Sequence, residues 1–125
     1  ECGVWKGGSM MGAALTLLRL TDRSRHIHLF DTYEGFPDEP TGRDGAEARR
    51  FFDGQATIPR WLEGTLERVH AAMLSTGFPE SRFHLVKGRV QDTLPDRAPR
   101  TISILRLDTD MYDSTRHELV HLFPA

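Results

Sequence analysis

Residues that could bind a ligand recur at four points along this chain, each next to a short apolar segment. The first is the opening run, residues 1–9, which reads Glu-Cys-Gly-Val-Trp-Lys-Gly-Gly-Ser. The others are Asp31, residues 87–92 and Asp108, each of which follows an apolar run. Ligands of open parallel sheets bind beyond the carboxyl ends of the strands, so these four points should converge on one site.

The opening run, called the glycine loop below, is typical of a nucleotide or cofactor cradle. Its glycines let the backbone approach a ligand, and the helix expected after it offers free N–H groups. Trp5 stands where GxGxxG requires its second glycine, and Ser9-Met10 replaces the Lys-Ser/Thr pair of a P-loop. ATP or GTP hydrolysis is therefore disfavoured, and a plain strand-to-helix turn is the alternative interpretation.

Asp31 lies about 20 residues beyond the glycine loop, where a carboxylate can accept hydrogen bonds from both ribose hydroxyls of an adenosine-type cofactor. A capping or loop aspartate is the alternative. Two aromatic residues follow, Tyr33 and Phe36, which could cover a ligand or pack in the core. After the third apolar run, Gln91 and Asp92 could hydrogen-bond an adenine edge, although a plain polar loop fits equally well.

Asp108 and Asp110 are two carboxylates at positions i and i+2, directly after the fourth apolar run. Such a pair suits a hard cation such as Mg²⁺. One of the two carboxylates could also act as a general base. Asp108 continues the strand and should face the site, whereas Asp110 and Asp113 could instead stabilise the positive N-terminus of the last helix.

A second motif, at residues 117–121, reads His-Glu-Leu-Val-His and matches the HExxH signature of zinc proteases. Thr115 and Glu118 also fit a capping box, which would give Glu118 a structural role. No third ligand follows the motif, so zinc hydrolysis is disfavoured. The other histidines are interpreted as ordinary surface or core residues: His26, His28, His70 and His84.

Short β-like runs alternate with helical stretches, which predicts an α/β fold with a mainly parallel sheet. We expect strands over residues 26–30, 82–86 and 101–107, the last being the clearest, and a strand stub in the glycine loop. Helices are expected over residues 10–20, 59–76 and 114–122. Leu62, Leu66, Val69 and Met73 share one face of the second helix. Residues 32–54 should form a long loop with a helical turn near residues 46–52.

Four strands are fewer than a doubly wound sheet normally has, so we expect residues 1–125 to be the front half of one domain, cut at both ends. Hydrophobic residues make up 38% and charged residues 27%, as in ordinary globular proteins. The net charge of -2 and the absence of a basic block argue against nucleic acid as a partner. No apolar run is long enough for a membrane span, and the single cysteine, Cys2, excludes an intrachain disulfide. A cytoplasmic location fits this composition.

The four points extend into longer motifs in a fixed order. After the glycine loop come Leu-Phe-Asp-Thr-Tyr-Glu-Gly-Phe-Pro (residues 29–37), Lys-Gly through Asp-Thr-Leu-Pro (87–95), and Leu-Arg-Leu-Asp-Thr-Asp-Met-Tyr-Asp-Ser-Thr (105–115). Over nearly its whole length the chain resembles the macrocin O-methyltransferase (TylF/MycF) family of S-adenosylmethionine-dependent methyltransferases. The last motif is the most distinctive of the four.

The resemblance implies a class I methyltransferase fold with a Rossmann-like sheet. It also implies that Asp108 ligates Mg²⁺, with Asp110 beside it, and that Asp108 can deprotonate the acceptor hydroxyl. The residues that would bind S-adenosylmethionine are Glu1, Gly3, Gly7 and Ser9 for the methionine part, Asp31 for the ribose, and Gly88, Val90 and Gln91 for the adenine.

The expected function is methyl transfer to a hydroxyl, in particular a sugar hydroxyl, of a small-molecule natural product. An NAD-dependent oxidoreductase could use the same sheet and Asp31, although GxGxxG is missing; a non-catalytic relic is a further alternative. The family places more metal-binding aspartates beyond the point that matches residue 125. We therefore expect a partial metal site and no catalysis by these residues alone. Residues 38–55 could contribute to the acceptor side; a homo-oligomer is among the possible assembly states.

Overall fold

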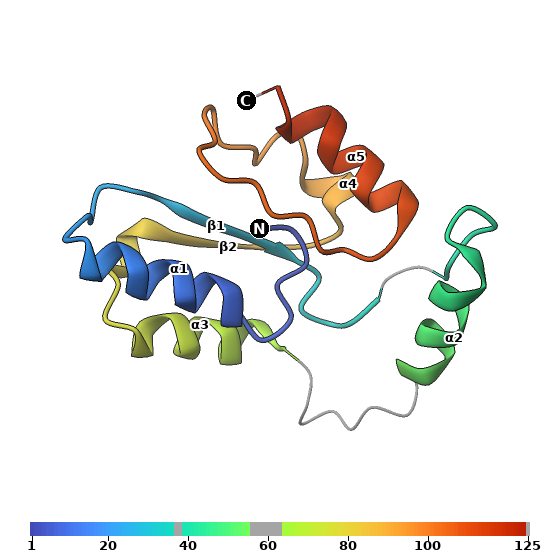
Figure 1. The fold of residues 1–125 in the computed structure, drawn as a ribbon, viewed down its shortest axis with the longest axis horizontal. Helices are drawn as coiled ribbons and strands as arrows, with labels where there is room; N and C mark the ends of the chain where they lie inside the picture. The colour runs from blue at the N-terminus through green and yellow to red at the C-terminus, as the bar shows by residue number, and fades with distance from the viewer. Residues whose placement is uncertain (37–38, 56–63, 125) are drawn as a thin grey trace.

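The chain folds as an alternation of helices and strands, shown in Figure 1. The computed structural model describes residues 1–36, 39–55 and 64–124. No helix within these residues is long and apolar enough to cross a membrane. The elements are α1 (Gly8–Arg19), β1 (Ile27–Asp31), α2 (Gly45–Gln55), α3 (Leu66–Ser75), the 3₁₀ turn η2 (Glu80–Arg82), β2 (Phe83–Lys87), α4 (Val90–Thr93) and α5 (Tyr112–Leu122).

The sheet is parallel, as the alternation of elements predicts. Strands β1 and β2 pair in register from Ile27 opposite Phe83 to Asp31 opposite Lys87. Cys2 extends this sheet, because it forms one parallel bridge to Phe30 and another to Leu107. The order across the sheet is therefore β2, β1, the glycine loop at Cys2, and the chain at Leu107.

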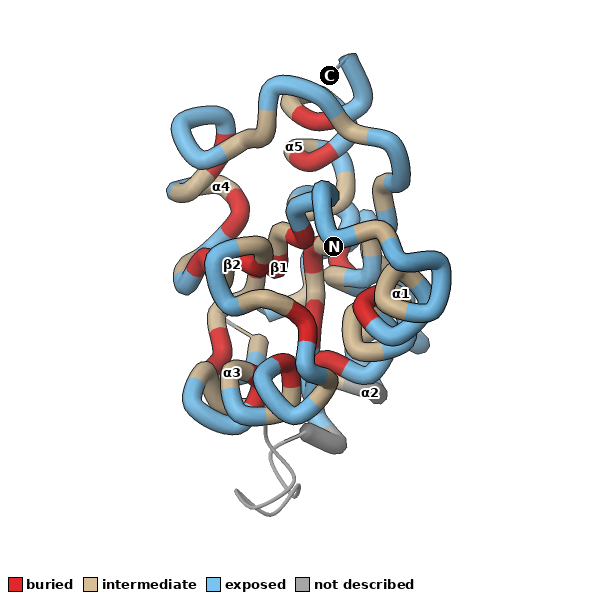
Figure 2. The backbone as a smooth tube through the Cα atoms, turned by 90° about the vertical axis from the view of Figure 1, so that its left-hand side faces the viewer, coloured by how far each residue is buried: buried red, intermediate tan, exposed pale blue. Residues whose placement is uncertain are grey.

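Helices cover both faces of the sheet, and the alternation of side chains along β1 divides the core in two. Leu29 points to the face covered by α1 and α3, where Ala14 and Met73 are buried. Phe30 points to the other face, where it packs with Val90 of α4. Figure 2 shows the buried positions between these layers, and in Figure 1 α2 stands apart from them.

Local signals explain where two of the helices begin. Gly7 has the left-handed conformation (φ 79°) immediately before α1. Helix α3 begins at Leu66, because the hydroxyl of Thr65 accepts a hydrogen bond from the backbone N–H of Arg68 and caps the helix. The predicted helix start at Pro59 lies outside the described residues, as does Leu62.

The predicted strand over residues 101–107 is wrong except at its end. Only Leu107 pairs with the sheet, and Ile104 is 87% exposed. A strand needs a continuous neighbouring backbone, and within the described residues the backbone here hydrogen-bonds across the sheet only to Cys2, through Arg106 O and Asp108 N. Two helices also differ from expectation: α4 occupies the predicted loop after Gly88, and α2 is longer than one turn.

Candidate functional site

The carboxylate of Asp31 fixes the glycine loop to the end of β1. Its Oδ2 accepts hydrogen bonds from the backbone N–H groups of Val4 at 2.6 Å and Trp5 at 3.1 Å. Its Oδ1 accepts from the N–H of Tyr33 at 2.7 Å. Asp31 thus organises the loop that was expected to hold a cofactor. Its predicted contact with a ribose stays a prediction.

Gly3 brings the glycine loop against the segment that carries Asp108. It has a left-handed backbone (φ +79°), and a Cβ at this position would lie 2.1 Å from the carbonyl oxygen of Asp108. Gly8 is different, because a Cβ there would meet nothing within 4 Å. The start of α1 is therefore open, and Gly8 and Ser9 are both exposed there.

A single guanidinium joins two of the predicted site residues. Nη1 of Arg106 pairs with Oε1 of Glu1, and Nη2 lies 2.8 Å from Oδ2 of Asp108. The Glu1 side chain is only 1% exposed, and its Oε2 has no hydrogen-bond partner among the described residues. Burial raises the pKa of the Glu1 carboxyl, while Arg106 and, to a smaller extent, the nearby Ser9 hydroxyl act in the opposite direction.

Arg106 was not predicted from the sequence, where it reads as one polar residue in an apolar run. The signal lies in the period of two along an extended segment, which puts Arg106 and Asp108 on one face. The parallel bridge between Cys2 and Leu107 makes Glu1 and Arg106 neighbours on adjacent chains. That register could not be read from the sequence.

Asp108 and Asp110 lie close enough to interact electrostatically. Burial and the charge of Asp108 both raise the pKa of Asp110, which has a left-handed backbone (φ 65°). Within the described residues there is no group of three or more His, Cys, Asp or Glu side chains that could hold a metal ion. Among the described residues, these two carboxylates are the ligands available to the predicted Mg²⁺ site, which stays a prediction.

The residues predicted to line an adenine lie where β2 meets α4. The N–H of Gly88 donates to the carbonyl of Asp31 at 3.0 Å, so Gly88 borders the strand ends. Val90 is buried in the core beneath α5. Gln91 donates from its amide to the hydroxyl of Ser114 at 3.2 Å, which braces α4 against α5. Contacts of these three residues with an adenine stay predictions.

Of the two aromatic residues after Asp31, Tyr33 packs in the core. It is buried, and its hydroxyl donates to the carbonyl of Leu29 at 3.0 Å. Phe36 instead meets Phe52 of α2 edge to face, with ring centroids 6.3 Å apart. Phe36 thus links the end of β1 to the segment expected on the acceptor side.

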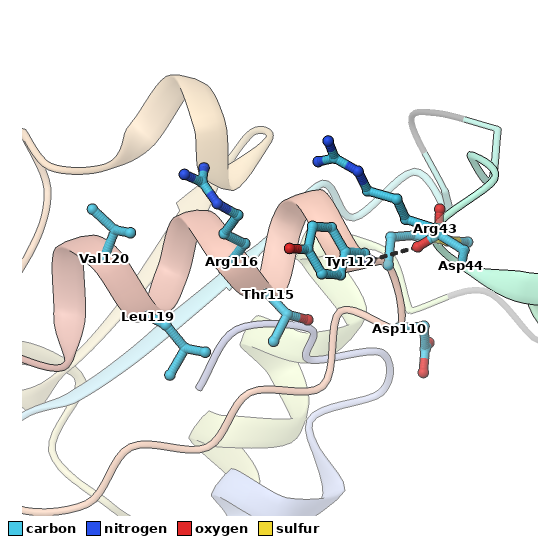
Figure 3. A pocket seen from close by; sticks show the side chains of 9 residues that line it. Arg43, Asp44, Asp110, Tyr112, Thr115, Arg116, Leu119 and Val120 are labelled. Carbon is cyan, nitrogen blue, oxygen red and sulfur yellow. Dashed lines mark hydrogen bonds between the residues drawn. The ribbon is translucent and has the colours of Figure 1, made fainter.

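A pocket of about 610 Å³ lies between the start of α2 and the outer surface of α5, as Figure 3 shows. Asp44 closes one end: its Oδ1 accepts from the N–H of Tyr112 at 2.5 Å and so caps α5. The guanidinium of Arg43 lies 5.3 Å from the centre of the Tyr112 ring. Asp110 also lines the pocket, next to the strand-end site. The capping role of Asp44 was missed, because the long loop before α2 gives no sign of contacting α5.

The HExxH motif lies on α5, and the capping box proposed there is wrong. Helix α5 already begins at Tyr112, so Thr115 lies within it. Glu118 is fully buried, and both of its carboxylate oxygens lack a hydrogen-bond partner in the described part of the chain. Burial raises its pKa, and the nearby Thr109 hydroxyl offsets part of the rise. His117 lies against His121, with ring centroids 4.3 Å apart.

Three histidines that no sequence motif groups together, His26, His28 and His84, form a cluster at the sheet. His28 and His84 are cross-strand partners, with ring centroids 4.7 Å apart. Nη1 of Arg82 lies 2.7 Å from Nε2 of His26, and Nδ1 of His26 lies 2.7 Å from Nε2 of His84. A guanidinium only donates, so His26 accepts at Nε2 and donates from Nδ1 to His84. This arrangement requires neutral imidazoles.

We predict that the cluster makes the protein less stable at mildly acidic pH. Burial, followed by the neighbouring His84 and His26, lowers the pKa of His28 from 6.5 to about 4, and burial also lowers that of His84. Because the unfolded chain binds these protons more readily, stability is present above pH 6.5 and is lost as the pH falls toward 4. After allowance for solvent screening, the loss should be on the order of 1–2 kcal/mol.

Urea denaturation at a series of pH values measures this loss. The double variant H28Q/H84Q should reduce the dependence of the free energy of unfolding on pH between pH 6.5 and about 4. The control H121Q, on α5, should show the same pH dependence as the wild type. Equal slopes for H28Q/H84Q and the wild type would assign the acid sensitivity to other groups.

Comparison with known proteins identifies the family. The macrocin-O-methyltransferase (TylF) family matches residues 1–125. The chain is 30% identical over 129 residues to an 8-demethyl-8-(2,3-dimethoxy-alpha-L-rhamnosyl)-tetracenomycin-C 4'-O-methyltransferase of Streptomyces olivaceus, covering 99% of this chain and 46% of that protein. It is 27% identical over 127 residues to a mycinamicin III 3''-O-methyltransferase of Micromonospora griseorubida, covering 99% of this chain and 48% of that protein.

A solved structure supports the same conclusion for the fold. The O-methyltransferase NovP superposes with a TM-score of 0.80 at 29% identity, over 98% of this chain and 50% of that one. The predicted methyltransferase-type α/β fold is thereby confirmed. The chain spans about half the length of the curated relatives it matches.

Proposed function

This chain belongs to the macrocin O-methyltransferase (TylF) family, and we propose that the protein transfers a methyl group from S-adenosylmethionine to a hydroxyl of a small-molecule natural product. One observation carries the proposal: the buried carboxylate of Glu1, whose Oε2 has no hydrogen-bond partner among the described residues, is linked through Arg106 to Asp108 near the carboxyl ends of the strands. A sugar hydroxyl is the favoured acceptor, since the name of one relative specifies the 4' position of a rhamnosyl compound and that of another the 3'' position of mycinamicin III.

The residues at this edge fit S-adenosylmethionine. Oε2 of Glu1 is a buried acceptor without a partner in the described residues, and an ammonium group would satisfy it. The open start of α1 at Gly8 and Ser9 offers backbone N–H groups to a carboxylate. Asp31 already accepts from backbone N–H groups, yet its oxygens keep lone pairs that ribose hydroxyls could use.

Fewer of the described residues are available to bind Mg²⁺ than to bind S-adenosylmethionine. Asp108 and Asp110 supply two carboxylates, and Mg²⁺ commonly binds proteins through one or two carboxylates while it keeps several waters. The ion would lower the pKa of an acceptor hydroxyl bound to it.

The chain's own residues account for the remaining chemistry. S-adenosylmethionine supplies, when bound, a methyl group on a positively charged sulfur. Asp108 would take the proton that the acceptor hydroxyl loses as its oxygen bonds to the methyl carbon and the bond from that carbon to the donor sulfur breaks. Arg106 donates a hydrogen bond from Nη2 to Oδ2 of Asp108 and so would fix the orientation of this carboxylate. The glycine loop would hold the donor so that the two reacting atoms stay aligned.

Calorimetry on the protein expressed from its complete reading frame tests the proposal against the oxidoreductase alternative. We expect S-adenosylmethionine to bind with a dissociation constant of about 1–100 μM, within the usual range for enzyme ligands, and NAD not to bind. Methyl transfer to a glycosylated acceptor should then be detectable by mass spectrometry as a gain of one CH₂ unit. Binding of NAD without binding of S-adenosylmethionine would reject the proposal.

A further inference from the structure

We propose that Arg106 is a positioning residue that holds Glu1 and Asp108 together, so that each carboxylate presents one free oxygen to the site. This inference rests on the proposed function, since it concerns how S-adenosylmethionine would be bound. Neither the family comparison nor the sequence motifs assign a role to Arg106. Its contacts with both carboxylates are the observation that carries the proposal.

The backbone places the three side chains before any ligand is present. The N–H of Cys2 donates to the carbonyl of Arg106 at 3.0 Å, and the N–H of Asp108 donates to the carbonyl of Cys2 at 2.8 Å. This pairing sets Glu1 beside Arg106, and the period of two sets Asp108 on the same face. The three side chains are therefore adjacent because of the sheet.

The geometry of the guanidinium suits this double contact. Nη1 donates to Oε1 of Glu1 and Nη2 donates to Oδ2 of Asp108, so one planar guanidinium binds two carboxylates at once. Oε2 of Glu1 and Oδ1 of Asp108 have no hydrogen bond to the described residues. A lysine has one compact ammonium and would not hold both carboxylates in the same fixed arrangement.

The contact with Arg106 should have its largest effect on Glu1, because the Glu1 side chain is buried. Its side chain is almost fully buried, whereas those of Arg106 and Asp108 are about half exposed. A buried carboxylate without a cation is costly, and one that is paired on one oxygen can keep its charge for a ligand. Arg106 thus acts on the donor side through Glu1, and on the acceptor side it orients Asp108.

A double-mutant cycle for S-adenosylmethionine binding tests this inference in the protein made from its complete reading frame. We expect R106M to weaken binding about 10-fold or more, as removal of one partner of a buried charge pair does. R106K should fall between R106M and the wild type. In the E1Q background R106M should add about twofold or less, because Arg106 acts through Glu1.

A matched control and the kinetics separate positioning from stability. Arg25 provides the control, because it forms an exposed ion pair with Asp22 in the loop before β1, at the amino end of that strand. It also donates to the hydroxyl of Ser103 at 3.1 Å, and so contacts the segment that carries Arg106 without contacting Glu1. R25M should bind S-adenosylmethionine as the wild type does. With R106M, KM for S-adenosylmethionine should rise by a larger factor than kcat falls. Wild-type affinity in R106M, or a full-sized effect of R106M in E1Q, would overturn the inference and leave the proposed function standing. Failure of the wild type to bind S-adenosylmethionine would overturn both.

Discussion

Replacement of Asp108 by Asn should slow methyl transfer by about 10³-fold while S-adenosylmethionine binds within about threefold of the wild-type affinity. Asn has the same shape as Asp, and its amide oxygen can still accept the hydrogen bond from Nη2 of Arg106. What Asn lacks is the charge that accepts a proton and binds a cation. The change therefore removes chemistry and leaves the donor side, at Glu1 and the glycine loop, in place.

Single-turnover methyl transfer and calorimetry on the same preparation measure the two quantities. Asp113 provides the matched control, because it is an exposed aspartate nearby whose ion pair is with Arg43 at 3.5 Å. D113N should keep the wild-type rate. If D108N keeps that rate as well, Asp108 is neither the base nor an essential cation ligand, and D110N becomes the variant to measure.

Asp108 shows how far a sequence can predict a site of this kind. The strands before it were predicted from short apolar runs, and β1 and β2 lie within one residue of the expected positions. The rule that ligands bind at the carboxyl ends of parallel strands then placed Asp31 and Asp108 at one edge. The structure brings the glycine loop to both of them, through Gly3 and through the hydrogen bonds of Asp31.

Arg106 and the histidine cluster could not be predicted, because both depend on register between chain segments far apart in sequence. Glu1 and Arg106 are neighbours only because Cys2 pairs with Leu107. His28 meets His84 only because β1 and β2 align as they do. Burial is equally hidden from local pattern: Glu118 matches a capping box by spacing, yet it lies inside α5 and faces the core.

The close contact between Gly3 and the backbone of Asp108 is needed both for the fold and for the candidate site. We therefore expect G3A to be strongly destabilising. An added Cβ would lie 2.1 Å from the carbonyl oxygen of Asp108 and 2.5 Å from its carbon, so backbone must move. Alanine also disfavours the left-handed conformation (φ +79°) that Gly3 adopts. Together these effects should lower the free energy of unfolding by about 3–5 kcal/mol.

Urea denaturation of G3A and G8A measures this expectation with a control from the same loop. Gly8 begins α1 with open space around its Cβ position, so G8A should unfold within about 1 kcal/mol of the wild type, or be more stable, because alanine favours helix. Equal midpoints for G3A and the wild type would show that the loop and the Asp108 segment can separate without cost.

The G3A protein that does fold should also bind S-adenosylmethionine poorly. The added Cβ displaces the backbone at Asp108, and with it the pairing of this segment with Cys2 that places Arg106 next to Glu1. D108N and G3A thus separate the two contributions of this sheet edge, because the first removes a charge from an intact site and the second removes the alignment on which the charges depend.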